Sequence, residues 1–209
     1  MSTLVPISAH DHERKWQAEA RKEFEGHVVR ALPHDQGWTF SHTNHGNHAG
    51  EIVLCRYACI LVHGDLPDVM YQGGHYDEPR SRLSWLGQSN LDYLANKVRL
   101  GKREDYEEAV ALWWILDRLK EEEAYASDEG EDDDYIARHR NCIEGLRDAE
   151  NRLRRGDGEH ELRTFLVEEV FEHDYEVVEN FGKVVSFDVI WTTGAAAHVW
   201  RAVEEGRVV

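Results

Sequence analysis

The sequence predicts an α+β fold, with a small, mostly antiparallel sheet and several helices packed on one of its faces. Short apolar or alternating segments with glycine-rich connections fill the first third of the 209 residues. Three or four helical patterns follow, and a strand–helix pair ends the chain. Strands that precede the helices favour a sheet with segregated helices over an alternating parallel sheet.

The chain is short enough to form one domain, since single cores grow to about 250 residues. It is 41% hydrophobic, and its seven Trp, eight Tyr and six Phe can fill a core. No internal repeat or long linker marks a boundary. We therefore expect one domain over 1–209, with a His- and Gly-rich part over about 27–88, an acidic helical part over about 89–182 and a closing strand–helix unit over 183–206.

The first elements are predicted from hydrophobic spacing. A helix over Ser8–Phe24 begins at a serine cap and has a narrow apolar face. Two β-like segments follow at 27–32 and 37–42. Glu51–Val62 is apolar on nearly every position and is predicted as one strand in the centre of the sheet.

The middle of the chain changes from strands to helices. Val69–Tyr71 is predicted as a short returning strand, and residues 72–86 are expected to be irregular. A capping pattern predicts a helix over Ser89–Leu100. A longer helix is predicted over Arg103–Glu123, and its apolar stretch Ala109–Leu116 belongs either in the core or in an oligomer interface.

The last elements are two helices, a strand and a closing helix. Tyr135–Arg155 is amphipathic and stops before Gly156, and Glu159–Asn180 is predicted as one further helix. Lys183–Trp191 alternates between apolar and other residues, which predicts a strand. The closing helix is predicted over Gly194–Glu205.

The net charge of −17 is concentrated in the second half of the chain. Residues 1–100 carry 12 acids and 10 bases, whereas residues 101–209 carry 29 acids and 14 bases. A negative surface repels nucleic-acid phosphates and anionic membranes, so we expect neither as a direct partner. A basic protein surface, such as that of a DNA-binding protein, fits better. The acids predicted to bind it form one tract: Asp128, Glu129, Glu131, Asp132, Asp133 and Asp134.

Two other origins of the acidity stay open. Net charge by itself confers solubility. A high-salt host also favours acidic surfaces with few lysines, and the chain has six Lys against 18 Arg. A GC-rich genome produces the same excess of arginine, so the sequence does not separate these origins.

A cytoplasmic location is predicted from three absences. The longest apolar run, Ala109–Leu116, is far shorter than the roughly 20 residues that span a bilayer. The first 25 residues carry charges throughout and lack the apolar segment of a signal peptide. Three cysteines, Cys55, Cys59 and Cys142, give no disulfide framework and are expected to be buried free thiols.

Histidines in one loop form the sharpest chemical pattern. His42, His45 and His48 recur at every third residue in a loop that is rich in glycine and asparagine, and His63 lies in a nearby turn. Neutral imidazole is a good ligand for zinc and for other divalent transition metals. The pattern therefore predicts a metal site, although its spacing matches none of the established zinc signatures.

If the chain is an enzyme, that metal would activate water for hydrolysis. Asp65, Asp77 and His75, in the turns beside the histidine loop, are then the candidates for a further ligand or a general base. Phosphate-binding glycine loops and the serine-hydrolase motif are absent from the sequence. Cys142 has His139 one helical turn away, but its apolar stripe favours packing over catalysis.

Two functions of different classes follow from these patterns. The first is a non-catalytic interaction or inhibitor protein whose acidic half binds a basic, DNA-binding protein and in its strongest form imitates DNA. The alternative is a metal-dependent hydrolase built on the histidine loop. A homodimer across the apolar stretch Ala109–Leu116 is compatible with either function.

Overall fold

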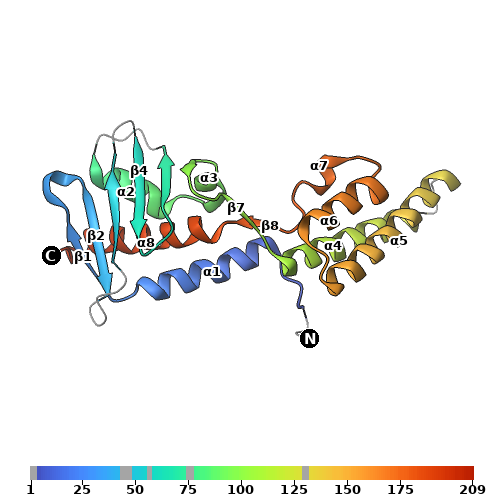
Figure 1. The fold of residues 1–209 in the computed structure, drawn as a ribbon, viewed down its shortest axis with the longest axis horizontal. Helices are drawn as coiled ribbons and strands as arrows, with labels where there is room; N and C mark the ends of the chain where they lie inside the picture. The colour runs from blue at the N-terminus through green and yellow to red at the C-terminus, as the bar shows by residue number, and fades with distance from the viewer. Residues whose placement is uncertain (1–3, 43–48, 56–57, 74–77, 129–131) are drawn as a thin grey trace. The chain divides into compact units, whose positions relative to one another are not determined.

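The computed structural model describes residues 4–42, 49–55, 58–73, 78–128 and 132–209. Over these residues it contains eight α-helices, a six-stranded antiparallel sheet and a two-stranded sheet (Figure 1). The predicted α+β class, with a mostly antiparallel sheet, is therefore confirmed. None of the helices in this part of the chain has the length and apolarity needed to cross a bilayer.

The chain divides into two compact units. The helical unit comprises Met1–His12 and Tyr106–Val184, and the sheet unit comprises Glu13–Asp105 and Val185–Val209. The helical unit carries 25 acids and 10 bases, a net of −15, whereas the sheet unit carries 16 acids and 14 bases, a net of −2. Nearly all of the acidic surplus thus belongs to one structural unit. The expectation that the chain folds as a single domain stays a prediction.

Unit boundaries fall within three elements. These are the first helix, α1 (Ala9–Phe24), and two short paired strands, β7 (Glu104–Tyr106) and β8 (Lys183–Val185). The predicted first helix is confirmed. Its cap is the Ser8 hydroxyl, which accepts a hydrogen bond from the Asp11 N–H at 3.1 Å.

The sheet unit is built on six strands that pair in chain order, each antiparallel to the next. They are β1 (His27–Ala31), β2 (Gly37–His42), β3 (Ala49–Leu54), β4 (Cys59–Gly64), β5 (Val69–Gln72) and β6 (Val98–Leu100). A 3₁₀ turn, η1 (Pro33–Asp35), joins β1 to β2. The strands predicted at 27–32, 37–42 and Val69–Tyr71 are therefore confirmed.

The single central strand predicted over Glu51–Val62 was wrong, because this segment is a hairpin. β3 and β4 pair with each other, and the Cys55 N–H donates to the Cys59 carbonyl at 2.9 Å next to the turn. Ala58 has a φ of 56°, the left-handed conformation that reverses the chain. The prediction failed because both strands are apolar and the residues between them include one charged residue, Arg56, but no Gly, Pro, Asn or Asp to mark a turn.

One face of the sheet is buried and covered by helices. Alternate side chains of a strand point to opposite faces, and the buried set is Val29, Trp38, Phe40, Ile52, Ile60, Val62, Val69, Tyr71 and Val98. These side chains share one core with residues of α1, α2 (Pro79–Gln88), α3 (Leu91–Ala95) and α8 (Phe187–Glu204). The predicted arrangement of helices on one face of the sheet is therefore confirmed.

Two helix predictions around residue 88 need correction. Residues 72–86, expected to be irregular, include most of α2, which begins with a proline in its first turn, where the missing N–H has no cost. The helix predicted over Ser89–Leu100 consists only of the five-residue α3. The chain leaves this helix because β6 adds to the edge of the sheet beside β5, a pairing that local propensity does not reveal.

The prediction of a strand over Lys183–Trp191 is correct only for its first three residues. β8 ends at Val185, and α8 starts at Phe187 rather than at Gly194. Ser186 caps the helix, because its hydroxyl accepts a hydrogen bond from the Val189 N–H at 3.2 Å. Alternating apolar residues are typical of a strand. Here they occupy different sides of a helix that is buried on most of its surface.

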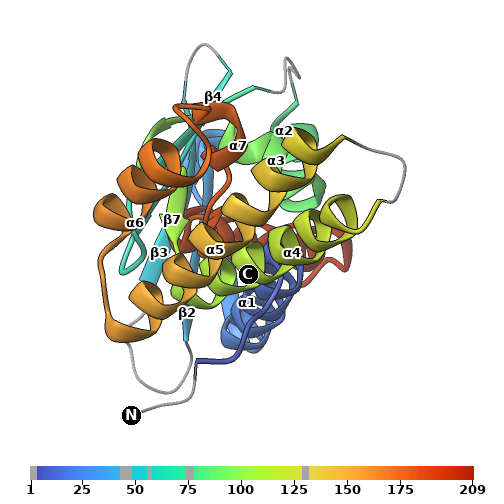
Figure 2. The same ribbon diagram turned by 90° about the vertical axis from the view of Figure 1, so that its right-hand side faces the viewer.

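The helical unit is centred on an antiparallel pair of long helices. α4 (Glu108–Ala126) and α5 (Asp133–Arg155) lie side by side in both views (Figures 1 and 2). Helix α5 confirms the amphipathic prediction and ends at Gly156, whose φ is 97°. Most of the apolar stretch Ala109–Leu116 is buried within this unit, although Trp113 is 37% exposed. A homodimer stays a prediction.

The helix predicted over Glu159–Asn180 is broken into three parts. α6 (Glu159–Phe165) continues into a π-helical turn, η2 (Leu166–Val170), and a separate short helix, α7 (Tyr175–Val178), follows. η2 packs closely on α5, where a Cβ on Gly145 would lie 2.7 Å from the Val170 side chain. The apolar periodicity continues through the break, and for this reason it did not reveal the break.

Candidate functional site

The described residues hold only part of the predicted metal site. His42 is the last residue of β2, and its side chain lies outside the described part. His45, His48, His75 and Asp77 lie outside the described residues altogether. Within the described residues there is no group of three or more His, Cys, Asp or Glu side chains able to hold a metal ion. The metal site and the hydrolase therefore stay predictions.

The two remaining candidates, His63 and Asp65, lie in different surroundings. His63 is paired in register with Glu51 on the partly exposed face of the sheet, and its Nε2 lies 3.5 Å from the Glu51 carboxylate. Asp65 follows Gly64, which has a φ of 122°, and lines a cavity next to the buried face. The structure thus separates these two residues instead of joining them in one site.

Much of the acidic tract around residue 130 has a structural role. Asp132 caps α5 by accepting a hydrogen bond from the Tyr135 N–H at 2.8 Å. Asp133 and Asp134 are exposed in the first turn, where carboxylates stabilise the positive end of the helix dipole. Asp128 is also exposed, and Glu129 and Glu131 lie outside the described residues. Partner binding by this tract stays a prediction.

A second acidic group is prominent in the structure and was not singled out from the sequence. No Lys or Arg occurs between residues 164 and 182. Within the described part of the chain, none of the six acids in this segment forms an ion pair, and all six are exposed. We call them the acidic face: Glu168, Glu169, Glu172, Asp174, Glu176 and Glu179.

The backbone beneath the acidic face is unusual. The π-helical turn η2 is closed by the Phe171 N–H, which donates to the Leu166 carbonyl at 2.9 Å. Two consecutive residues that are not glycine then have positive φ values, Glu172 at 47° and His173 at 70°. π-helical turns and left-handed residues other than glycine both occur frequently at functional sites. This segment is therefore the best candidate for a functional surface in the helical unit.

An exposed aromatic ring lies among these acids. Tyr175 is 69% exposed, and it borders a hollow of about 280 Å³. Val167 and Val178 line the hollow with apolar side chains, and Glu168 and Glu179 line it with carboxylates. Arg163 and His160 also border it, and the Arg163 guanidinium is bound to Glu159 and to backbone carbonyls. An aromatic ring and two carboxylates around an apolar hollow suit the long stem and the charged end of a Lys or Arg side chain.

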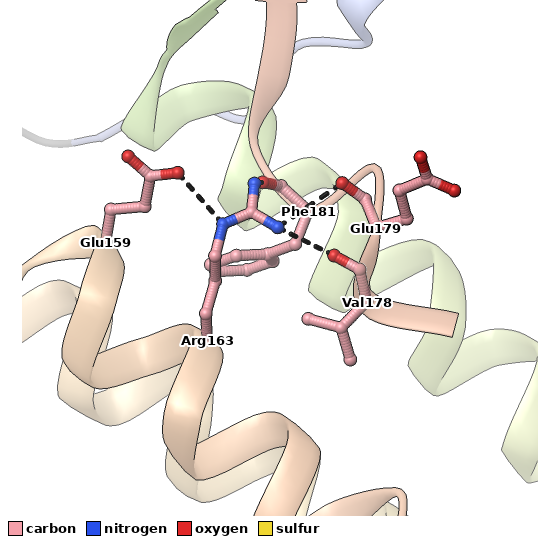
Figure 3. A network of polar contacts seen from close by, with 5 residues as sticks. All are labelled: Glu159, Arg163, Val178, Glu179 and Phe181. Atoms are coloured by element: carbon pink, nitrogen blue, oxygen red, sulfur yellow. Dashed lines mark hydrogen bonds and ion pairs between the residues drawn. The ribbon is translucent and has the colours of Figure 1, made fainter. Parts of the chain in front are cut away.

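Arg163 binds the backbone at the end of this segment (Figure 3). Its Nη1 donates to the carbonyls of Val178 at 2.8 Å and Glu179 at 3.3 Å, and its Nη2 donates to the Phe181 carbonyl at 2.5 Å. The Nε donates to Glu159 one turn earlier in α6 at 2.9 Å. One guanidinium thus ties α6 to the segment that carries the end of the acidic face.

The Cys142 thiol is expected to resist alkylation in the folded protein. Burial, with Glu122 close by, raises the pKa of this thiol to about 12, so the reactive thiolate is scarce at neutral pH. Cys55 and Cys59 are partly exposed and should react first. A chromogenic thiol titration should detect two thiols before denaturant is added and the third afterwards. Fast reaction of all three in the native protein would contradict the buried, packing role of Cys142.

A single sequence signal could have located the acidic face. This signal is the absence of cations over 164–182, whereas the tract around residue 130 has Arg138 and Arg140 close by. The exposure of Tyr175 and the π-helical turn depend on tertiary packing and have no sequence signature.

In comparisons with known proteins, no protein family, no curated protein and no solved structure matches the chain.

Proposed function

We propose that the protein is a non-catalytic interaction protein whose acidic face binds a basic surface of another protein. The observation that carries the proposal is a run of six exposed acids on both sides of the exposed Tyr175 in the sequence, none of which forms an ion pair within the described part of the chain. One of them, Asp174, also caps α7 by accepting hydrogen bonds from the N–H groups of Glu176 and Val177. Aromatic residues are enriched at protein interfaces, and complementary charge gives specificity and fast association. The net charge of −15 on the helical unit adds long-range attraction for a cationic partner.

In its strongest form, the acidic face occupies the nucleic-acid site of a DNA-binding protein and inhibits it. Carboxylates on a rigid backbone then stand where DNA phosphates would lie, and lysine or arginine side chains of the partner pair with them. Arg163 gives the face its rigidity by holding the carbonyls at the end of α7. Duplex DNA should therefore compete with this protein for such a partner.

Charge reversal on the acidic face should weaken binding to a basic partner by about tenfold or more. The variant Glu168→Lys/Glu179→Lys replaces the two carboxylates on the rim of the hollow. Fluorescence anisotropy with a labelled Arg- and Lys-rich peptide measures the effect, and a Glu-rich peptide of equal length serves as the negative probe. Raising NaCl from about 100 mM to about 500 mM should weaken wild-type binding at least as much.

The matched control is Glu108→Lys/Glu144→Lys. These two exposed residues lie on α4 and α5 and are not among the six acids of the acidic face, so the control makes the same change in net charge with all six in place. It should weaken binding less than about threefold, since only the long-range attraction falls. Equal losses in the two variants, or binding that is insensitive to salt, would refute the proposed role of this face.

A third variant separates the acidic face from the acidic tract predicted from sequence. Asp128→Asn/Asp133→Asn removes two exposed carboxylates of the tract and leaves Asp132 to cap α5. If the acidic face is the binding surface, this variant should bind the basic peptide nearly as well as the wild type. A loss as large as that of Glu168→Lys/Glu179→Lys would move the interface to the tract.

A further inference from the structure

A cavity of about 320 Å³ lies next to the buried face of the sheet, entirely within the sheet unit. Its walls come from the end of α1, the first turns of α8, the strands β1, β2 and β3, and the β4–β5 connection, which contributes Asp65. The volume is at the small end of the range of about 300–1,000 Å³ for ligand pockets. It therefore suits a small molecule rather than a peptide.

Glycines in the sheet explain why the space exists. Gly50 of β3 and Gly64 of β4 lie directly opposite each other in register, so two neighbouring strands present no side chain at this level. A Cβ on Gly50 would lie only 2.3 Å from the ring of Phe40, which occupies part of that space. The remaining volume forms the cavity, and closing it with a side chain at Gly50 would displace Phe40.

Three phenylalanines and one tryptophan line the cavity. Phe187 and Trp191 are one turn apart on α8 and stack with ring centroids 4.4 Å apart and an interplanar angle of 22°. Phe24 and Phe40 meet edge to face on another side, with centroids 5.7 Å apart. The faces of such rings are electron-rich and attract cations, and a tryptophan ring attracts them most strongly.

Among the described residues that line the cavity, the carboxylates of Glu23 and Asp65 carry negative charge. Glu23 and Asp65 line it and are exposed, and no Lys or Arg occurs among the described residues that form its wall. His27 is the other titratable side chain there, and it is buried. Aromatic faces inside and two carboxylates beside the solvent together favour a positive charge carried on an apolar body.

We propose that this cavity binds a small organic cation, an alkyl- or arylammonium ion. The apolar body of the ligand contacts the phenylalanine rings, and its ammonium group lies between the indole of Trp191 and the carboxylates of Glu23 and Asp65. An anion is repelled by the same carboxylates, and a neutral molecule of equal shape lacks the cation–π attraction. This site is separate from the acidic face and does not depend on the function proposed for it.

Three probes of similar size test the charge preference by isothermal titration calorimetry. They are benzylammonium, benzyl alcohol and benzoate, each titrated into the full-length protein near neutral pH, where benzylamine is protonated. The cation should bind with a Kd of about 1 mM or tighter, as expected for a ligand of this size. The alcohol should bind at least about tenfold more weakly, and benzoate more weakly still.

Two variants test the location of the site. Glu23→Gln/Asp65→Asn alters only exposed positions and should weaken binding of the cation about tenfold while leaving that of the alcohol unchanged. Trp191→Leu should weaken cation binding by a similar factor, whereas Trp113→Leu in the helical unit should have no effect. The proposal is overturned if the cation and the alcohol bind equally, if neither binds below about 10 mM, or if the carboxylate variant binds the cation as the wild type does.

Discussion

Replacing Arg163 with alanine should lower the free energy of unfolding of the helical unit by about 3 kcal/mol. The guanidinium donates to the carbonyls of Val178, Glu179 and Phe181 (Figure 3). Hydrogen bonds from a charged donor are stronger than neutral ones, and alanine leaves this group of carbonyls without that donor. Phe181 is fully buried and contacts the ring of Trp114, so the loss reaches the core.

Two matched variants separate this role from a simple surface ion pair. Glu159→Ala removes only the carboxylate that pairs with the Arg163 Nε, and that side chain is 45% exposed. An exposed i, i+4 pair stabilises a helix by about 0.5 kcal/mol or less, so the change in stability should be small. Arg163→Lys should have an intermediate effect, because one ammonium does not reproduce the geometry of the guanidinium fork.

Urea unfolding followed by circular dichroism measures these differences, and hydrogen exchange locates them. In Arg163→Ala, the amide hydrogens of α7 should exchange faster before those of α4 and α5 do. Binding of the basic peptide should weaken as well, because the acidic face loses its fixed shape. If Arg163→Ala and Glu159→Ala lose equal stability, the carbonyl network contributes nothing beyond the ion pair.

The sequence predicted elements whose pattern is local. The helix of α1 and the long helix α5 have a cap or a terminal glycine and a clear apolar stripe, and both are present. The strands β1, β2 and β5 were also predicted. These elements share one property, which is that spacing and end signals within a single segment agree with their final environment.

The elements that the sequence did not predict depend on contacts between distant segments. The sequence predicts one strand across β3 and β4, because the residues between them include no Gly, Pro, Asn or Asp and only one charged residue, Arg56. It predicts a strand at the start of α8, because a helix buried on most sides loses its amphipathic period. The π-helical turn η2 depends on close packing against Gly145 of α5.

The candidate sites also include features that the sequence predicts and features that it does not. Net acidity was evident from composition, so the class of partner could be proposed from sequence alone. The location of the acidic face is harder to predict, because acids on an amphipathic helix are expected on its solvent side. Only the absence of Lys and Arg over 164–182 marks it in the sequence. Asp65 is a candidate in the sequence because its turn lies near the histidine loop, but the structure places it on the wall of an aromatic cavity. That cavity joins residues from five separate segments of the chain, and no spacing rule connects them.

Replacing Gly37 with alanine should destabilise the sheet unit by more than about 3 kcal/mol. Gly37 begins β2 with a φ of 149°, a conformation that side-chain-bearing residues rarely adopt. A Cβ at this position would lie 1.8 Å from the carbonyl oxygen of Ile52 on the neighbouring strand. Because this contact is with backbone and Ile52 is fully buried, relief requires moving β3 away from β2.

Gly26→Ala is the matched control, because it separates the backbone conformation from the clash. Gly26 also has a positive φ, 93°, but a Cβ there would meet nothing within 4 Å. Gly26→Ala should therefore lower the free energy of unfolding by about 1 kcal/mol, the penalty for a left-handed residue alone. Thermal and urea unfolding of the two variants measure the difference in stability. Equal losses of stability in the two variants would mean that β2 and β3 can separate at little cost in free energy. Since Phe40 and Gly50 of the cavity lie on these two strands, Gly37→Ala should also abolish binding of the organic cation, whereas Gly26→Ala should retain it.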